Sequence, residues 1–221
     1  MEFLLIIAAI ILAYLLGSIN FAVIFANLFT KKDVRDYGSG NAGMTNVLRV
    51  AGPVPGILTF ICDGAKGALA CYIGRYIIFD YLNANYNSEL FLPIYGALLC
   101  GIFCMLGHVF PVFFQFKGGK GVAISVGIFA VVDWRCIALA LGVFVGLLLI
   151  TRIVSISSLV ATISMPVWVA LFERQTNENL YISVALTIVM VIIIYVKHIE
   201  NIKRLIRREE KPIFGKSKKS K

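Results

Sequence analysis

The sequence predicts an all-α membrane protein, a polytopic bundle of about seven transmembrane helices. Hydrophobic residues make up 59% of the chain and charged residues only 15%, whereas a soluble domain has about 45–50% apolar and about 25% charged residues. Mean hydropathy is +0.87, and the apolar residues form long runs that are separated by short polar segments. A chain of 221 residues with this pattern leaves almost no room for a soluble domain.

Seven apolar stretches approach the ~20 residues that a helix needs to cross the hydrocarbon layer. The first is expected to be retained, because Glu2 precedes it instead of a basic segment and no small-residue cleavage site follows. The stretches at 119–133 and 136–151 are short, so five full spans plus a hairpin of two half-buried helices fit equally well. The predicted spans are 3–29, 54–79, 91–113, 119–133, 136–151, 154–172 and 180–197.

Lys and Arg residues predict the orientation, because cytoplasmic loops of membrane proteins carry an excess of them. The only basic residues in the loops predicted for the opposite side are Arg135 and Arg174. We therefore expect the N-terminus outside and the C-terminus in the cytoplasm. The net charge of +9 then reflects membrane orientation and not nucleic-acid binding. The basic residues of the predicted cytoplasmic side are Lys31, Lys32, Arg35, Arg49, Lys117, Lys120, Arg152 and those from Lys197 onward.

A single transmembrane domain is expected over 1–200, followed by a basic cytoplasmic tail over 201–221. The tail is expected either to contact anionic lipid or to act as a topology signal alone. The five cysteines lie in apolar stretches without Cys-x-x-Cys spacing, so we interpret them as small buried hydrophobic residues. No His/Cys metal-ligand cluster occurs in the sequence, and no metal or other cofactor is expected.

A glycine-rich loop over 38–49 lies between two apolar stretches. Its three glycines allow backbone N–H groups to point inward and bind an anion. Ser, Thr and Asn side chains add neutral donors, and an arginine can bind phosphate or carboxylate through two hydrogen bonds. A tight surface turn is the alternative interpretation. The candidate binding residues are Ser39, Gly40, Asn41, Gly43, Thr45, Asn46 and Arg49.

A second loop, over 116–121, favours the functional interpretation because it repeats this chemistry with two lysines around a Gly-Gly pair. Two lysines three residues apart can contact one phosphate from two sides. The spacing of a Walker A loop is missing, so nucleotide hydrolysis is not expected. The candidates in this region are His108, Lys117, Gly118, Gly119 and Lys120.

Polar residues also stand at the start of the span 154–172 and at the end of the last span. Arg152, Ser155 and Ser158 are spaced by three, which predicts one helix face near an N-terminus that favours an anion. A snorkelling arginine beside packing serines explains this pattern equally well. The spacing of His198 and Asn201 predicts that these two side chains face the same way.

One ionisable pair, Asp63 and Lys66, lies inside the second predicted span. Ionisable residues in a membrane span are costly and face a partner or a cavity. A buried salt bridge is the preferred interpretation, and neutralisation of a substrate phosphate by Lys66 is the alternative. Because the sequence contains no Ser-His-Asp order, Cys-His pair or HEXXH motif, an enzyme built on these residues must work by electrostatics and positioning.

Taken together, these motifs resemble the PlsY family, the bacterial glycerol-3-phosphate acyltransferases that use acyl phosphate. The resemblance runs nearly end to end. The matching stretches are GSGNAGMTNVLR at 38–49, DGAKG at 63–67, GHVFPVFFQFKGGKGVA at 107–123, TRIVSISS at 151–158 and HIENIKRL at 198–205. The departures from the family pattern are Met44 for Ala, Ile124 for Thr, Asn20 for Pro, Arg208 for Gly and Pro212 for Lys.

The resemblance implies a multi-pass enzyme of the bacterial inner membrane with a cytoplasmic active site. The implied reaction transfers a fatty acyl group from acyl phosphate to the 1-hydroxyl of sn-glycerol 3-phosphate, the first step of phospholipid synthesis. The products are 1-acylglycerol 3-phosphate and inorganic phosphate. Membrane lipid and the enzyme that forms the acyl phosphate are the other expected partners. The competing interpretation, a transporter of a phosphorylated anion, explains the cationic loops but not their position on one face.

The roles that the resemblance implies begin with direct attack of the glycerol hydroxyl on the acyl carbonyl. A phosphoryl oxygen of the donor takes the proton, with His198 as the alternative base. The candidate catalytic residues are His198, Asn201 and Lys120. The candidate substrate-binding residues are Ser39, Gly40, Asn41, Gly43, Thr45, Asn46, Arg49, Lys66, His108, Lys117, Gly118, Gly119, Arg152, Ser155 and Ser158.

Overall fold

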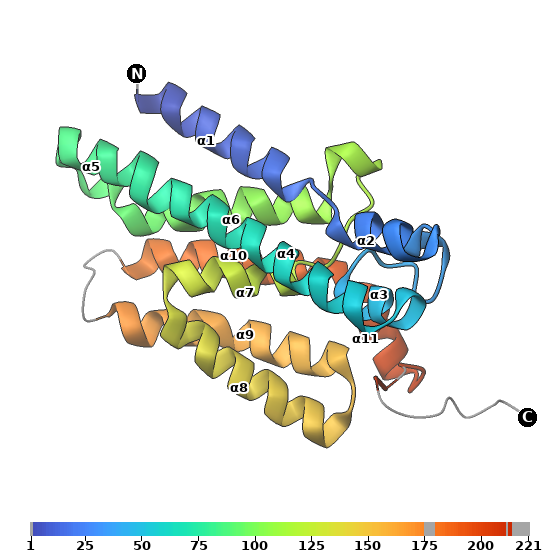
Figure 1. Ribbon diagram of the computed structural model, residues 1–221. Helices are drawn as coiled ribbons and strands as arrows, with labels where there is room; N and C mark the ends of the chain where they lie inside the picture. Colours follow the sequence, from blue (N-terminus) through green and yellow to red (C-terminus); the bar gives the residue numbers. More distant parts are fainter. Residues whose placement is uncertain (1, 175–179, 211, 214–221) are drawn as a thin grey trace, which may run out of the picture.

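The computed structural model describes residues 2–174, 180–210 and 212–213, and the regular structure in these ranges is helical throughout (Figure 1). The predicted all-α class is therefore confirmed. Residues 211 and 214–221 of the predicted basic tail lie outside the described residues. The helices are α1 (Glu2–Gly17), α2 (Phe21–Thr30), α3 (Met44–Ala51), α4 (Pro53–Tyr72), α5 (Asp80–Tyr86), α6 (Pro93–Val109), α7 (Val122–Val132), α8 (Trp134–Thr151), α9 (Val154–Glu173), α10 (Leu180–Lys197) and α11 (Ile199–Ile206). Shorter helical turns are η1 (Val34–Asp36), η2 (Ile73–Phe79), η3 (Glu89–Phe91) and η4 (Val112–Phe114).

Six helical stretches in the described part of the chain are long and apolar enough to cross a membrane. They are Glu2–Thr30, Pro53–Tyr86, Pro93–Phe114, Trp134–Thr151, Val154–Glu173 and Leu180–Lys197. The stretch predicted at 119–133 forms α7, which has only 11 residues and is ~16 Å long, about half of the ~30 Å hydrocarbon layer. Where the sequence predicted about seven spans, the structure thus has six candidate spans and one short apolar helix among its described residues.

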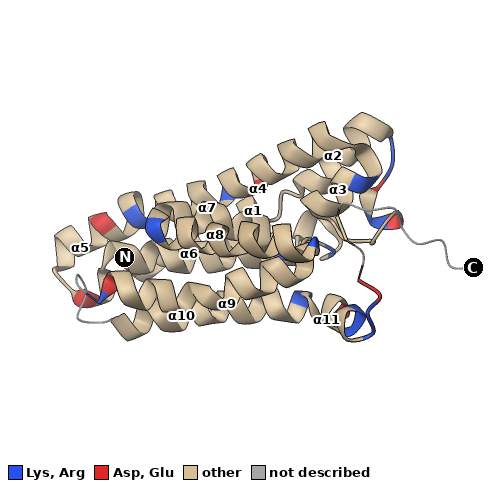
Figure 2. Ribbon diagram, turned by 90° about the horizontal axis from the view of Figure 1, so that it is seen from below, with Lys and Arg blue, Asp and Glu red and all other residues tan. Residues whose placement is uncertain are grey.

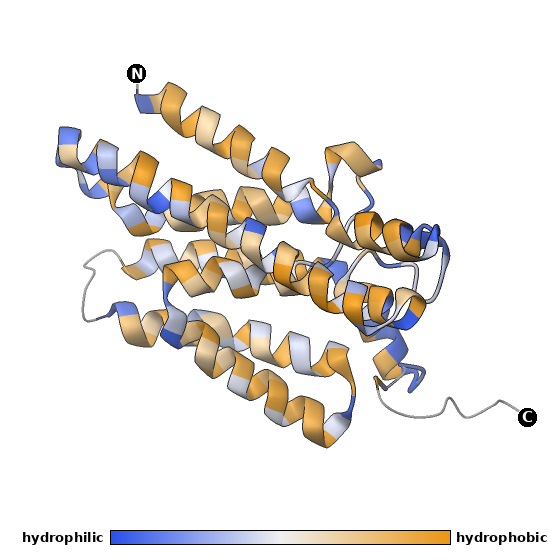
Figure 3. Cartoon of the chain, in the orientation of Figure 1, coloured by the Kyte–Doolittle hydropathy of each residue, from blue (hydrophilic) through white to orange (hydrophobic). Residues whose placement is uncertain are grey.

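Hydrophobic residues predominate along the helices (Figure 3), and many of them lie on the outer surface of the bundle. Large side chains such as Leu149, Ile150 and Tyr181 are exposed on this surface. The interior contains α7, whose Ile124 and Ile128 are completely buried. The short helix therefore packs inside the bundle, where other helices surround it.

Glycines bring the helix backbones together inside the bundle. A Cβ atom on Gly127 of α7 would collide with the carbonyl oxygen of Gly64 on α4. In the same way, Gly107 of α6 packs against the carbonyl oxygen of Tyr14 on α1. Small residues that permit close backbone approach are the usual means of packing helices in a membrane.

One arginine fixes the position of α7 along the bundle. Arg75 lies in the widened helical turn η2, and its Nη1 donates to the carbonyl oxygens of Val131 at 2.7 Å and Val132 at 3.0 Å. These carbonyls belong to the last turn of α7, where no intrahelical partner is available. Arg75 therefore anchors the C-terminal end of α7, and its N-terminal end lies about midway along the bundle (Figure 1).

Polar segments gather at one end of the bundle. Helices α2, α3 and α11 lie at this end, opposite the start of α1 and opposite α5 (Figure 1). Basic segments are concentrated beside α3 and α11, as Figure 2 shows. The assignment of this end to the cytoplasm remains a prediction from the charge distribution.

Candidate functional site

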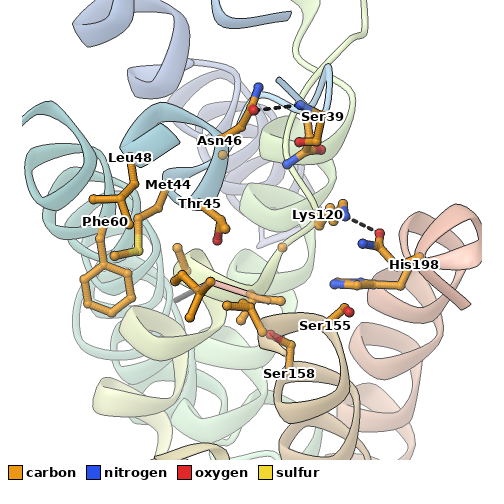
Figure 4. Close-up of a pocket in the computed structure, with 18 of the residues that line it drawn as sticks. Ser39, Met44, Thr45, Asn46, Leu48, Phe60, Lys120, Ser155, Ser158 and His198 are labelled. Carbon is orange, nitrogen blue, oxygen red and sulfur yellow. Dashed lines mark hydrogen bonds between the residues drawn. The ribbon is translucent and has the colours of Figure 1, made fainter. Parts of the chain in front are cut away.

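A cavity of about 570 Å³ lies at the polar end of the bundle, between the glycine loop with α3, the 117–121 loop with α7, and helices α4, α8, α9 and α11. Its walls differ in character. In Figure 4, Lys120, Ser155 and His198 lie on one side and Met44 and Phe60 on the other. The polar lining residues are Ser39, Asn41, Thr45, Asn46, Arg49, Asp63, His108, Lys120, Ser155, Ser158, His198, Asn201, Arg204, Glu209 and Glu210. Most of the predicted site residues are among them.

The glycine loop is shaped by Asn46, which is 1% exposed. Its Nδ2 donates to the carbonyl oxygens of Val34 at 2.8 Å and Tyr37 at 2.9 Å, and its Oδ1 accepts from the backbone N–H of Ser39 at 2.8 Å. Gly38 has a φ of 65°, and a Cβ there would collide with Asn46 Oδ1. Asn46 therefore holds the loop in shape. The hydroxyls of Ser39 and Thr45 are left without a hydrogen bond to any described residue.

Two cations face the cavity from opposite walls. Arg49, on α3, is exposed and makes no ion pair with any described residue. Lys120 is part of the second loop, and its Nζ donates to Asn201 Oδ1 (Figure 4). Burial lowers the pKa of Lys120 to about 8; the charges of Arg204 and Arg49 also lower it, and that of Glu210 opposes them. Lys120 is thus mostly charged at neutral pH and close to its titration range.

His198 has a defined tautomer. Its Nδ1 lies 2.8 Å from the carbonyl oxygen of Ile194, and a carbonyl oxygen can only accept, so Nδ1 carries the hydrogen. The unprotonated Nε2 is then available to the cavity, and Figure 4 shows the ring reaching toward Lys120 and Ser155. Burial lowers the pKa of His198 to about 4. The imidazole is therefore neutral at pH 7 and acts as a hydrogen-bond acceptor.

The ionisable pair of the second span forms a buried cluster. Lys66 Nζ lies 2.9 Å from Asp63 Oδ1 and donates to the carbonyl oxygen of Ile19 at 2.6 Å. His108 Nδ1 is 3.5 Å from the same Asp63 oxygen. Asp63 and His108 line the cavity but Lys66 does not. The geometry fits a buried salt bridge between Asp63 and Lys66, the interpretation that the sequence favours.

Five further candidates lie outside the cavity lining, namely Gly40, Lys117, Gly118, Gly119 and Arg152. Gly118 and Gly119 allow the second loop to pass directly over His108, whose carbonyl oxygen accepts from the N–H of Gly119 at 3.1 Å. Lys117 is exposed on the outside of this loop. In Lys117-Gly-Gly-Lys120, only the second lysine therefore reaches the cavity.

The prediction that Arg152, Ser155 and Ser158 share one helix face is wrong for Arg152. Arg152 has a φ of 57° and caps α8, with its N–H bonded to the carbonyl oxygen of Leu148 at 2.8 Å. Helix α9 begins only at Val154. Spacing by three places residues on one face only inside one helix, so Ser155 and Ser158 line the cavity without Arg152.

Sequence reasoning missed three charged residues of the site, Arg204, Glu209 and Glu210. Arg204 lies three residues after Asn201 on α11, so the spacing argument that paired His198 with Asn201 extends to it. Glu210 follows the end of α11 and lies in the segment predicted as a basic cytoplasmic tail. No helical spacing could have found it.

The apolar part of the cavity runs between α4, α7 and α8. It is lined by Met44, Leu48, Phe60, Val122, Ala123, Val126, Leu141, Phe144, Leu148 and Val154. A smaller cavity of about 40 Å³ shares several of these residues and continues between α7, α8 and α9 as far as Met165. The fold and the site define an integral membrane protein with cationic and apolar walls in one cavity.

The comparison with known families identifies the chain more closely. A family model described as "Glycerol-3-phosphate acyltransferase" matches residues 7–208. The chain therefore belongs to the PlsY family of glycerol-3-phosphate acyltransferases. Membership supports an acyltransferase over the alternative of a transporter.

Relatives and solved structures agree along nearly the whole chain. Glycerol-3-phosphate acyltransferase 2 of Bacillus anthracis is 38% identical over 207 residues, which cover 94% of this chain and 98% of that protein. A glycerol-3-phosphate acyltransferase of Francisella tularensis is 38% identical over 219 residues, 95% of this chain and 93% of that protein. The crystal structure of PlsY in its glycerol 3-phosphate form is similar with a TM-score of 0.79 and 35% identity, covering 95% of this chain and 96% of that one. Its lysophosphatidic acid form gives a TM-score of 0.76 and 34% identity, with 95% of both chains covered.

Proposed function

We propose that this protein transfers a fatty acyl group from acyl phosphate to the 1-hydroxyl of sn-glycerol 3-phosphate. The products are 1-acylglycerol 3-phosphate and inorganic phosphate. The observation that carries the proposal is the cavity in which Arg49, Lys120 and Arg204 face a common space continuous with an apolar groove. Two phosphate groups and one acyl chain are the chemistry that such a cavity fits.

The polar wall suits glycerol 3-phosphate, and the similar PlsY crystal structure described above is a glycerol 3-phosphate form. Arg49, Ser39 and Lys120 are proposed to hold the phosphate of this substrate, because their donors face the cavity from two sides. Neutral His198 and Asn201 are proposed to orient the glycerol end. Arg can hold a phosphate through two parallel hydrogen bonds, which fixes the direction of the glycerol carbon chain.

The acyl phosphate is placed with its chain in the apolar groove and its phosphate near Thr45 and Ser158. These hydroxyls lie where the polar and apolar parts of the cavity meet. Holding both reactants in one orientation is the main source of rate for a reaction without a protein nucleophile. The backbone N–H groups and cations then stabilise the charge that develops on the carbonyl oxygen.

The reaction forms one bond and breaks one. The glycerol oxygen attacks the acyl carbonyl carbon, the bond from that carbon to the phosphate oxygen breaks, and phosphate leaves. The hydroxyl proton passes to a phosphoryl oxygen of the leaving phosphate. A histidine with a pKa of about 4 is a poor acceptor for this proton at pH 7, which supports orientation as the role of His198.

The site is proposed to face the cytoplasm of a bacterial cell, within the inner membrane. The supporting feature is the concentration of Lys and Arg at the end that carries α3 and α11 (Figure 2). Acyl phosphate is apolar in its chain and reactive in its head, so an enzyme that forms it at the membrane is the expected partner.

The test is an assay of protein purified in detergent, with palmitoyl phosphate and glycerol 3-phosphate as substrates. We expect release of inorganic phosphate and equimolar 1-palmitoylglycerol 3-phosphate, and no product with palmitoyl-coenzyme A or palmitoyl-acyl carrier protein. Arg49→Ala should abolish turnover. The matched control Lys203→Ala, on the exposed face of α11, should not. Acylation from coenzyme A but not from acyl phosphate would refute the proposed donor.

A further inference from the structure

Glu210 forms the centre of a hydrogen-bond network on the polar wall of the cavity. Its Oε1 accepts from Asn201 Nδ2 at 2.6 Å and from Ser155 Oγ at 2.9 Å, and its Oε2 accepts from Arg204 Nε at 2.8 Å. Asn201 in turn accepts from Lys120 through Oδ1. One carboxylate thus accepts directly from donors on α9 and α11, and through Asn201 it is connected to Lys120 of the second loop.

The chain reaches this position by folding back after α11. Arg208 has a φ of 59°, and the N–H of Glu209 bonds to the carbonyl oxygen of Arg204 at 2.8 Å, which reverses the chain direction. Beyond the turn, the N–H of Ile213 donates to the carbonyl oxygen of Arg152 at 2.9 Å, at the end of α8. Glu209, Glu210 and Ile213 all line the cavity on this side.

We infer that Glu210 is a positioning residue of the acyltransferase site, which orients Asn201 and holds Lys120 and Arg204 for the anionic substrates. The inference rests on the proposed function. A carboxylate only accepts hydrogen bonds, so it fixes the Asn201 amide with Nδ2 toward Glu210 and Oδ1 toward Lys120. Without Glu210, no other described residue on this wall determines which end of the amide faces the lysine.

The bonds that Glu210 makes leave donors free for a substrate. Lys120 has three N–H groups and gives one to Asn201, and Arg204 contacts the carboxylate through Nε alone among its guanidinium nitrogens. Arg49 on the opposite wall makes no contact with the carboxylate. Glu210 thus holds Arg204 directly and Lys120 through Asn201, and the remaining N–H groups of these two cations bind the substrate phosphates.

The carboxylate is also the counter-charge of a cationic cluster. Lys120 faces Arg204 on α11, Arg49 on α3 and Lys197 at the end of α10, all of which lower its pKa, while Glu210 raises it. His198, which also faces Lys120, is neutral at pH 7. Removing the charge of Glu210 therefore lowers the pKa of Lys120, and the lysine then loses its proton at a lower pH.

The experiment compares wild type, Glu210→Gln and Glu200→Gln by the pH dependence of kcat/KM for glycerol 3-phosphate. Glu200 is the matched control, because it also pairs with a basic residue of α11 but is exposed to solvent. Gln keeps the size of Glu and removes its charge. We expect the alkaline limb of Glu210→Gln to move to lower pH by about 0.5–1 unit, which is less than the ~1–3 units of a direct pair. The Glu200→Gln limb should coincide with that of wild type.

Binding of glycerol 3-phosphate, measured by calorimetry on the same proteins, gives a second readout that needs no donor. We expect about five- to thirtyfold weaker binding in Glu210→Gln at pH 8, and partial recovery in Glu210→Asp. An unshifted limb with unchanged affinity would overturn the inference. Tighter binding in Glu210→Gln would overturn it as well, because the carboxylate would then compete with the substrate anion. If wild type binds glycerol 3-phosphate but does not use acyl phosphate, the proposed donor fails, and the binding comparison still decides the role of Glu210.

Discussion

His198 gives the sharpest test of how the proton moves. Burial lowers its pKa from 6.5 to about 4, a difference that corresponds to about 3 kcal/mol against the imidazolium form at about 1.36 kcal/mol per unit. A general base must become this imidazolium in the transition state, so the site opposes that role. An orienting residue needs only the neutral Nε2, which the hydrogen bond from Nδ1 to Ile194 provides.

The perturbation is His198→Gln, with His198→Ala beside it. Glutamine offers one amide to the cavity and loses about one hydrogen bond, worth ~0.5–1.5 kcal/mol, so kcat should fall only about 2- to 12-fold. Alanine offers no polar group and leaves the Ile194 carbonyl without this partner, at a cost of ~1–3 kcal/mol or about 5- to 150-fold. A general base would instead lose about 10²–10⁴-fold in both variants.

The assay measures phosphate release from palmitoyl phosphate between pH 5 and pH 9, together with calorimetric binding of glycerol 3-phosphate. If His198 only orients the substrate, the acid limb of the profile is the same in wild type and in His198→Gln, because it then belongs to the substrate phosphate with its pKa of about 6. A glutamine variant that folds, binds glycerol 3-phosphate and shows no turnover would refute the reasoning in favour of a histidine base.

Four further outcomes are expected. Arg49→Lys should lose nearly as much kcat/KM as Arg49→Ala in the phosphate-release assay, since lysine keeps the positive charge but lacks the planar guanidinium group. Near-wild-type turnover of Arg49→Lys would show that Arg49 does not recognise a substrate phosphate. Lys120→Ala should raise the KM for glycerol 3-phosphate about ten- to hundredfold, the worth of a charge-assisted contact of ~1.5–3 kcal/mol. Lys117→Ala should leave KM unchanged, because this lysine is exposed outside the cavity lining; equal effects of both would contradict the assigned geometry. In intact cells of a variant without native cysteines, a cysteine at Asn85 should react with an impermeant thiol reagent and one at Asp36 should not; the reverse labelling would place the site on the outer face.

The sequence predicted the regions of the site better than the roles of single residues. Glycine and serine patterns are local, so the loop at 38–49 and the pair Ser155 and Ser158 could be found from spacing alone, and both line the cavity. Spacing does not reveal where a helix begins. Arg152 therefore looked like a member of the serine face, although it ends the preceding helix in a left-handed conformation.

Long-range contacts were beyond the reach of the sequence pattern. The pairing of Lys66 with Asp63 follows from their spacing of three. Only the fold, however, places Lys120 against Asn201 at the cavity. Glu210 reaches the site through a chain reversal at Arg208, in a segment whose basic composition indicated a cytoplasmic tail. The number of membrane spans was uncertain for a related reason, because hydropathy does not distinguish a short helix enclosed by protein from one in contact with lipid.

The shortness of α7 has a consequence for how a lipid can be built without leaving its leaflet. Because α7 is ~16 Å long and is anchored at its C-terminal end by Arg75, the loop that precedes it lies about midway along the bundle (Figure 1). On the proposed function, glycerol 3-phosphate would enter this recess to meet the acyl chain, and the chain would stay among the helices. Extraction of a chain of ~16 carbons into water would cost about 12 kcal/mol at ~0.8 kcal/mol per methylene. On the proposed function, a recess midway along the bundle would avoid that cost in every catalytic cycle and would leave the new lipid in the bilayer.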